Sequence, residues 1–383
     1  MSVSRRGFVK SVGAGSVGVI SSSFIIGRGR EAWASETDQV QQVFDDGMIR
    51  ISSNENARGP GPSALRALHE TISARAGRGY PPDHTEELLS TIAEAHGVPE
   101  ASVIVATGSG PILAGAVHAF CSAQRGLVTA APTYATCENT ARGLGYPVTA
   151  VRVDGAMSLD LDAMADAARG AGLVFFCNPN NPTGTAHPAN EVESFVRRVK
   201  ERSPDTAILI DEAYLDYTHD RSVRTVRPLT QELPGVFITR SLSKAHGMAG
   251  LRVGYAIGQS ETVQRISRAW HLGSMNTLSA VAAATSIRDQ AHIADEVAEN
   301  ARVRRLVVSS FRELGYDVPE PHTNFVFVDL GRPAGWFREE CRKKGLVIGR
   351  DFPPLEQTHS RISLGTMEEM ERSASVFREI LRA

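Results

Sequence analysis

A lysine flanked by phosphate-suited side chains is the feature of this sequence with the most evident chemistry. Ser241 and Ser243 lie three residues and one residue before Lys244. Arg252 lies eight residues after it. A lysine amine can form a Schiff base with a carbonyl cofactor, while hydroxyls and a guanidinium can hold a phosphate beside it. The pattern therefore predicts a pyridoxal-phosphate site with Lys244 as its catalytic residue; a solvated surface lysine is the alternative.

Two apolar runs that lead into polar residues indicate where this cofactor lies. Residues 207–210 are apolar and Asp211 follows them, which is typical of a buried parallel strand ending in a carboxylate. Ligands of open α/β sheets lie at the carboxyl ends of strands, so Asp211 is expected to pair with the pyridinium nitrogen. A second apolar run, 173–177, precedes the turn that contains Asn181. Alternatively, Asp211 caps a helix and Asn181 is only a turn residue.

Further motifs occur in one order along the chain. They are Asn54-Glu-Asn56, Tyr80-Pro81, Gly108-Ser-Gly110, Pro132-Thr-Tyr134, Asn181-Pro-Thr-Gly184, Asp211-Glu-Ala-Tyr214, Ser241-Leu-Ser-Lys244, Arg252, Thr323-Asn-Phe325 and Ser360-Arg-Ile-Ser-Leu-Gly365. The series resembles the class I/II aminotransferases of fold-type I, which depend on pyridoxal phosphate, and within them the histidinol-phosphate aminotransferase-like branch. The resemblance extends from about Asn54 to Gly365.

The resemblance implies roles for several residues around the cofactor. Asn181 and Tyr214 would hydrogen-bond the phenolate oxygen of the cofactor. Tyr134 would stack on the pyridine ring, with core packing as its alternative role. Ser109 and Gly110 would offer backbone N–H groups to the phosphate at the start of a helix. The acidic pair that the branch often carries after these glycines is absent here, which changes the details of the phosphate contacts.

The resemblance also implies substrate contacts and a partner subunit. Arg361 would bind the substrate α-carboxylate, because a guanidinium offers a planar and permanently charged partner. Asn54 and Asn324 would line the substrate pocket, and Arg350 would meet a distal anionic group. Tyr80 would reach the phosphate of the neighbouring subunit, which implies a homodimer with shared active sites.

The resemblance and the alternation of apolar strand and helix patterns imply an α/β fold. A large domain with a mostly parallel sheet between helices is expected, together with a smaller α/β domain. A helix is expected over 85–96, and strands over 102–106, 325–329 and 345–348. The expected division is 1–34 as a signal peptide, 35–75 as an arm with part of the small domain, 76–275 as the large cofactor-binding domain and 276–383 as the small domain.

The N-terminus has the order of a twin-arginine signal peptide. Arg5 and Arg6 precede a glycine- and serine-diluted apolar stretch, and the run Ala32-Trp-Ala34 follows it. Cleavage after Ala34 and recognition by the twin-arginine export machinery are predicted, so the mature protein would be periplasmic or extracellular. The alternative is a basic tail on a cytoplasmic protein.

Composition narrows the function classes. The formal net charge is −2 and no basic block occurs, which argues against a nucleic-acid partner. The cysteines show no metal-ligand spacing, so no metal site is expected.

Ping-pong transamination between an amino acid, or an amino alcohol phosphate, and a 2-oxo acid is the predicted reaction, with Lys244 moving the α-proton. A decarboxylase or lyase on the same scaffold, and a non-catalytic cofactor-binding protein, are the alternatives. The branch suggests histidinol phosphate as the substrate, whereas export argues against it. The segment 54–57 ends in Ala57 where the family has proline, which leaves the substrate pair open.

Overall fold

The computed structural model describes residues 47–72 and 82–382. The predicted signal peptide and Tyr80 lie outside these residues. From Ile49 onward the chain forms one compact unit. No helix in the described ranges is long and apolar enough to cross a membrane.

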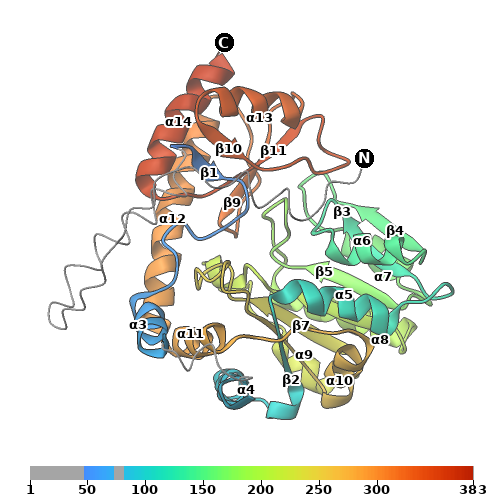
Figure 1. The fold of residues 1–383 in the computed structure, drawn as a ribbon. Coiled ribbons are helices and arrows are strands. Elements are labelled where there is room, and N and C mark those ends of the chain that lie inside the picture. Colours follow the sequence, from blue (N-terminus) through green and yellow to red (C-terminus); the bar gives the residue numbers. More distant parts are fainter. Residues whose placement is uncertain (1–46, 73–81, 383) are drawn as a thin grey trace, which may run out of the picture. The chain divides into compact units, whose positions relative to one another are not determined.

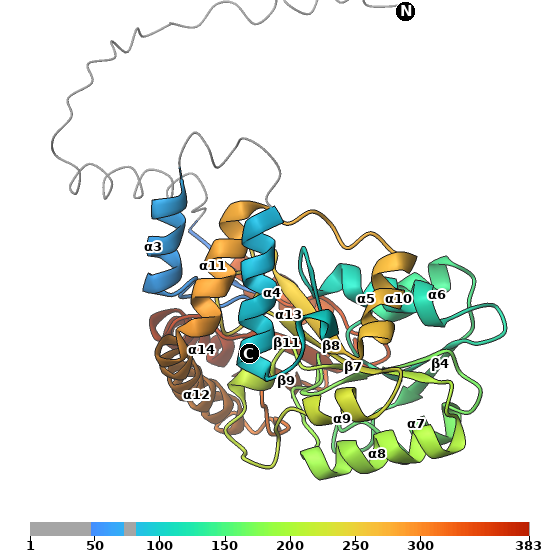
Figure 2. The same ribbon diagram turned by 90° about the horizontal axis from the view of Figure 1, so that it is seen from below.

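Seven strands of the described chain form the large sheet, in the order β2-β8-β7-β6-β5-β3-β4 (Figures 1 and 2). Strands β3 to β7 pair in parallel, and β8 runs antiparallel to both of its neighbours. The mostly parallel sheet that the sequence predicts is therefore confirmed. The strands are β2 (Val103–Ala106), β3 (Leu127–Ala131), β4 (Val148–Arg152), β5 (Leu173–Cys177), β6 (Ala207–Asp211), β7 (Val236–Ser241) and β8 (Gly254–Gly258).

Helices cover both faces of this sheet because successive strand residues point to opposite sides. In β6, Ile208 and Ile210 belong to one apolar cluster, whereas Ala207 and Leu209 belong to another. Side chains of α3, α4, α7, α8, α9 and α11 complete the first cluster, and those of α5, α6 and α10 complete the second. The helices are α3 (Pro62–Thr71), α4 (Pro82–His96), α5 (Ser109–Phe120), α6 (Thr136–Gly143), α7 (Leu161–Ala167), α8 (Ala189–Arg202), α9 (Arg227–Glu232), α10 (Ser260–Ala269) and α11 (Thr277–Arg288), with the short 3-10 turns η1 (Glu100–Ser102) and η2 (Leu215–Tyr217).

The C-terminal elements form a separate apolar cluster that includes β1 from the start of the described chain. Strand β1 pairs in parallel with β10, and β9 pairs antiparallel with β11. Figure 1 shows the long helix α12 leading from α11 to these strands. The elements are β1 (Ile49–Ile51), α12 (Gln290–Arg312), β9 (Phe325–Asp329), α13 (Ala334–Lys343), β10 (Leu346–Ile348), β11 (His359–Ser363) and α14 (Met367–Arg382).

The division into domains with boundaries at 75 and 275 remains a prediction. In the structure α11, which follows the second boundary, packs its alanines into the cluster on the large sheet. Ile49 and Ile51 instead pack with the C-terminal elements. The four cysteines are free and buried, so each occupies core space as a small apolar side chain.

Candidate active site

Lys244 follows β7 and points toward the N-terminal segment of the described chain. Its Nζ donates to the backbone oxygen of Asn54 at 2.9 Å. Burial, together with the like charge of Arg361, lowers the pKa of Lys244 from 10.5 to about 8. A substantial neutral fraction near neutral pH gives this amine the nucleophile that a Schiff base requires.

Asp211 ends β6 as the sequence predicts, and it is almost completely buried. Thr239, its partner on β7, donates its hydroxyl to the carboxylate at 2.9 Å. The backbone N–H of Ala213 also donates to it. Burial raises the pKa of Asp211 to about 6 despite these hydrogen bonds. A buried carboxylate of this kind is suited to a cationic ring nitrogen, because such a partner would offset the cost of burying its charge.

A chain of side-chain hydrogen bonds joins four of the residues named from the resemblance. The hydroxyl oxygen of Tyr214 accepts from Asn54 Nδ2 at 3.1 Å and from Asn181 Nδ2 at 3.3 Å. The Oδ1 of Asn181 accepts from Nη1 of Arg361 at 2.8 Å. Burial raises the pKa of Tyr214, so the phenol keeps its proton. Because its oxygen already accepts two bonds, that proton is the group it offers to a further acceptor.

The start of α5 is open to an anion. Ser109 and Gly110 are its first residues, and the preceding Gly108 makes no side-chain cap. The first N–H groups of a helix lack partners within the helix. Gly108 has a φ of +91°, and a Cβ added to it would lie 2.2 Å from Nη2 of Arg252. Glycine is therefore required for the guanidinium to approach this helix end.

The two serines of the lysine motif lie in the same cavity. Ser241 and Ser243 are buried, and Nη1 of Arg252 is 3.4 Å from the hydroxyl of Ser243. Together with Ser109, Lys244 and Asp211 they line a cavity of about 250 Å³. The serine hydroxyls, Arg252 and the start of α5 can hold a phosphate. Asp211 supplies a buried carboxylate and Lys244 an amine, so the residues of this cavity fit pyridoxal phosphate.

Arg361 lies in the middle of β11, and two of its five N–H donors make hydrogen bonds. Its Nη2 donates to the backbone oxygen of Ser52 at 2.6 Å, and its guanidinium lies 4.7 Å from the ring centroid of Phe352. Burial lowers the pKa of Arg361 to about 10, so it remains charged at neutral pH. Its buried Nε has no hydrogen-bond partner. The side chain lines the cavity that contains Lys244, and a planar cation there is suited to an arriving carboxylate.

The remaining sequence-predicted residues take different places. Asn324 Nδ2 donates to the backbone oxygens of Asn54 and Glu55, at 3.1 and 3.2 Å, and so supports the segment that contacts Lys244. Tyr134 is half-buried and lines the cofactor cavity. Arg350 is exposed and lines a wider cavity of about 840 Å³ that also contains Lys244 and Arg361. Tyr80 lies outside the described residues.

Sequence reasoning missed two supporting residues. Ser363 accepts the backbone N–H of Asn54 at 2.8 Å and donates its hydroxyl to Asn54 Oδ1 at 2.6 Å. Ser363 lies two residues after Arg361 in the same motif. Residues two apart on a strand point to the same face, and this spacing could have identified Ser363. Thr239 has no such signal, because only the pairing of β6 with β7 places it beside Asp211.

The comparison with known proteins agrees with this arrangement. Residues 46–377 match the family model of aminotransferase class I and II. The chain is 32% identical over 339 residues to a histidinol-phosphate aminotransferase of Bacillus subtilis (strain 168), which covers 88% of this chain and 92% of the relative. It is 34% identical over 328 residues to an aromatic amino acid aminotransferase of Rhodococcus opacus (strain B4), with 84% and 87% covered.

A solved structure gives the same result in three dimensions. The crystal structure of histidinol-phosphate aminotransferase from Sinorhizobium meliloti, in complex with pyridoxal-5'-phosphate, matches with a TM-score of 0.80 at 27% identity. The match covers 88% of this chain and 91% of that one. With a family model that spans most of its length and a cavity suited to the cofactor, this chain belongs to the aminotransferase class I and II family, and its cofactor is pyridoxal phosphate.

Proposed function

We propose that Lys244, Asp211 and Arg361 carry the transamination that this aminotransferase performs. The observation that carries the proposal is the position of the Lys244 amine. Its pKa is lowered to about 8, and both Asp211 and Arg361 act on its charge. The three side chains come from separate elements, β6, the turn after β7, and β11, and they converge on adjoining cavities.

The cofactor, when bound, supplies the electron sink on which the amino group is exchanged. Lys244 would hold it covalently, and its Nζ, which the Asn54 carbonyl directs, would accept the substrate α-proton. Asp211 would hold the ring nitrogen in its protonated form. Tyr214 and Asn181 would hold the ring oxygen, and the phosphate would be held by Ser109, Gly110, Ser241, Ser243 and Arg252. Tyr134 lies where it can cover the ring.

Arg361 orients the substrate by its α-carboxylate, and this contact makes an amino acid a suitable donor. The wider cavity continues from Arg361 to the exposed Arg350, which leaves room for a side chain with a distal anionic group. The relatives named as histidinol-phosphate and aromatic amino acid aminotransferases support a substrate with a ring or a phosphate. A 2-oxo acid is the acceptor in the second half of the ping-pong reaction.

A panel of amino donors tests this function. The holoenzyme is incubated with one donor at a time without acceptor, and carbon dioxide is measured together with the carbonyl product, which is a 2-oxo acid from an amino acid and a ketone from an amino alcohol phosphate. Transamination yields about one 2-oxo acid per active site. Carbon dioxide without an oxo acid would identify a decarboxylase instead, and the absence of both from all donors would refute the assignment.

A homodimer with shared active sites is part of the proposal. Tyr80 would reach the phosphate site of the neighbouring subunit. Leu65 on α3 and Ile72 just after it are large apolar side chains with exposed fractions of 42% and 56%. Their exposure supports a surface that a second subunit covers. Light scattering on the purified protein gives the oligomeric state, and a monomer that retains full activity would contradict this part.

Export by the twin-arginine route is the last part of the proposal, and it rests on Arg5 and Arg6. The signal would be removed after Ala34 and the folded enzyme would cross the membrane with its cofactor. Replacing both arginines with lysine is expected to retain the protein in the cytoplasm. Unchanged export in a fractionation experiment would exclude this route.

A further inference from the structure

Two guanidiniums of the wider cavity share one buried aromatic ring. Phe352 is 3% exposed and is not among the residues that line that cavity. The guanidinium carbon of Arg350 lies 4.4 Å from the centroid of its ring, and that of Arg361 lies 4.7 Å from it. Phe327 on β9 contacts the ring edge-on, at a centroid distance of 6.2 Å. A packed ring therefore lies against two cations that both line the cavity.

Neither cation has a carboxylate partner in the part of the chain that the structure describes. Arg361 donates to neutral oxygens, and Arg350 donates from Nη1 to the backbone oxygen of Asp351 at 3.1 Å. The carboxylate of Asp351 is instead bound by Nη1 and Nη2 of Arg338, at 2.6 and 3.3 Å. Burial lowers the pKa of Arg361 to about 10, and the like charge of Arg350 adds to this effect. Two unpaired like charges in one cavity favour a ligand with two anionic groups.

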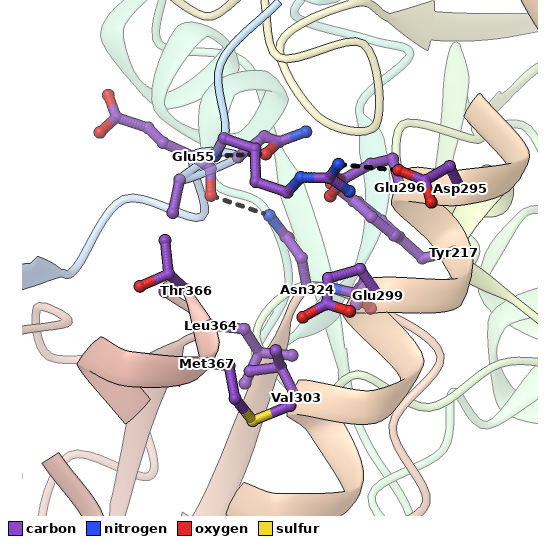
Figure 3. A pocket seen from close by; sticks show the side chains of 15 residues that line it. Glu55, Tyr217, Asp295, Glu296, Glu299, Val303, Asn324, Leu364, Thr366 and Met367 are labelled. Carbon is purple, nitrogen blue, oxygen red and sulfur yellow. Dashed lines mark hydrogen bonds and ion pairs between the residues drawn. The ribbon is translucent and has the colours of Figure 1, made fainter. Parts of the chain in front are cut away.

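Another cavity, which shares Glu55 with the cofactor cavity, has the opposite charge balance (Figure 3). Three carboxylates line it from α12, those of Asp295, Glu296 and Glu299. Arg58 contacts Asp295 at 2.7 Å and Glu296 at 3.3 Å, so this cation is already paired. An anionic group would be repelled there. The second anionic group of a substrate is therefore expected on the side of Arg350.

The ring restrains the two cations unequally. The negative face of an aromatic ring attracts a guanidinium. Arg361 is also held by two hydrogen bonds, so it keeps its place without the ring. Arg350 is exposed and has a single hydrogen bond in the described chain, so the ring of Phe352 is its main restraint.

We propose that Phe352 is a positioning residue that fixes the Arg350 guanidinium at a set distance from Arg361. In this way it makes the enzyme prefer amino donors whose side chain ends in an anionic group. The inference rests on the proposed function and deepens it, because it takes Arg361 as the partner of the substrate α-carboxylate.

Two acids that differ by one charge test the preference without turnover. Glutarate carries two carboxylates, and glutaramate has nearly the same shape with one carboxylate replaced by an amide. Each acid is titrated into the holoenzyme by calorimetry. We expect glutarate to bind about 10-fold more tightly, because a hydrogen bond to a charged group is stronger than one to a neutral group. Equal binding of the two acids would overturn the proposal.

Fluorinated phenylalanines test the ring itself. Replacing Phe352 by 3,5-difluorophenylalanine and then by pentafluorophenylalanine nearly keeps the size of the ring, while the negative charge of its face is progressively removed. Glutarate affinity should fall in that order, by roughly 2- to 5-fold in total. Glutaramate affinity should not change, because Arg361 keeps its hydrogen bonds. A glutarate affinity without this trend, or an equal weakening of both acids, would overturn the role of the ring.

Two leucine variants separate this role from packing. Phe352→Leu should lose glutarate affinity as the fluorinated proteins do. Phe337→Leu is the matched control, because Phe337 is also buried and packs against Phe377 at a centroid distance of 5.5 Å, with no guanidinium of the described chain over its ring. It should lower Tm but leave the ratio of the two affinities unchanged. An equal change of this ratio in both variants would contradict the proposal.

Turnover of glutamate and of glutamine is measured in parallel. A fluorine trend in binding without 2-oxo acid from either donor overturns only the proposed function. Turnover without the fluorine trend overturns only the role of Phe352.

Discussion

Arg361 should control the reactivity of Lys244 as well as the binding of substrate. The like charge of Arg361 is the largest cause after burial that lowers the pKa of Lys244 to about 8 from its ordinary 10.5. Replacing Arg361 with glutamine removes that charge, so the pKa of Lys244 should rise. The neutral amine is the reactive form, and the rise should make Lys244 a weaker nucleophile below pH 8.

The two pKa values bound the size of this effect. At pH 7.5 a lysine of pKa about 8 is neutral in roughly a quarter of molecules, whereas one of pKa 10.5 is neutral in about 0.1%. Covalent capture of the cofactor aldehyde should therefore slow in the Arg361→Gln variant, by up to roughly 200-fold if the full shift were lost. Lys244 stays buried in the variant, and burial is the larger cause of its lowered pKa. The rate of capture should therefore fall by much less than 200-fold.

Competitive labelling of the cofactor-free protein measures the pKa directly. Trace acetic anhydride is reacted across pH 6 to 11, and peptide mass spectrometry gives the labelled fraction of Lys244. The internal reference is Lys343, whose pKa is raised by its hydrogen bond to Glu340. A Lys244 that titrates with Lys343 in the native protein would refute the reasoning, as would an identical Lys244 titration with and without Arg361.

Three other substitutions test the remaining parts of the site. Asp211→Asn should lower kcat roughly 100-fold, because a buried charge-assisted hydrogen bond contributes about 1.5–3 kcal/mol. Steady-state kinetics measures this loss, and circular dichroism checks that the variant keeps its fold. Arg361→Lys should raise KM for the amino acid at least 10-fold, since one ammonium cannot replace a bidentate guanidinium, and a donor that lacks the carboxylate should show no such change. Gly108→Ala should weaken cofactor binding in a fluorescence titration, because its Cβ would displace Arg252. Gly145 has a similar positive φ of 71° but open space around it, so Gly145→Ala is the control that should bind the cofactor normally. Equal cofactor affinity in the two alanine variants would contradict the role given to the Gly108 approach.

Local patterns were sufficient to locate three strands of the large sheet, β2, β5 and β6. Strands β5 and β6 occupy the predicted residues because continuous apolar runs of that length bury both faces of a strand. Strand β1 was not predicted, since three residues form no recognisable alternation. The helix predicted over 85–96 begins earlier, at Pro82, because proline is favoured in the first turn of a helix.

The sequence by itself determined the cofactor chemistry, since Lys244, its serines and Arg252 lie within one short segment and Asp211 follows a strand that its own residues specify. Only the tertiary structure decided which distant residues complete the site. Ser363 meets Asn54 across 309 positions, and Arg361 meets Asn181 across 180. The side chain of Arg58 likewise meets α12 over 237 positions or more. Such hydrogen bonds have no periodicity in the chain, because their geometry exists only after the C-terminal strands have packed against the N-terminal segment.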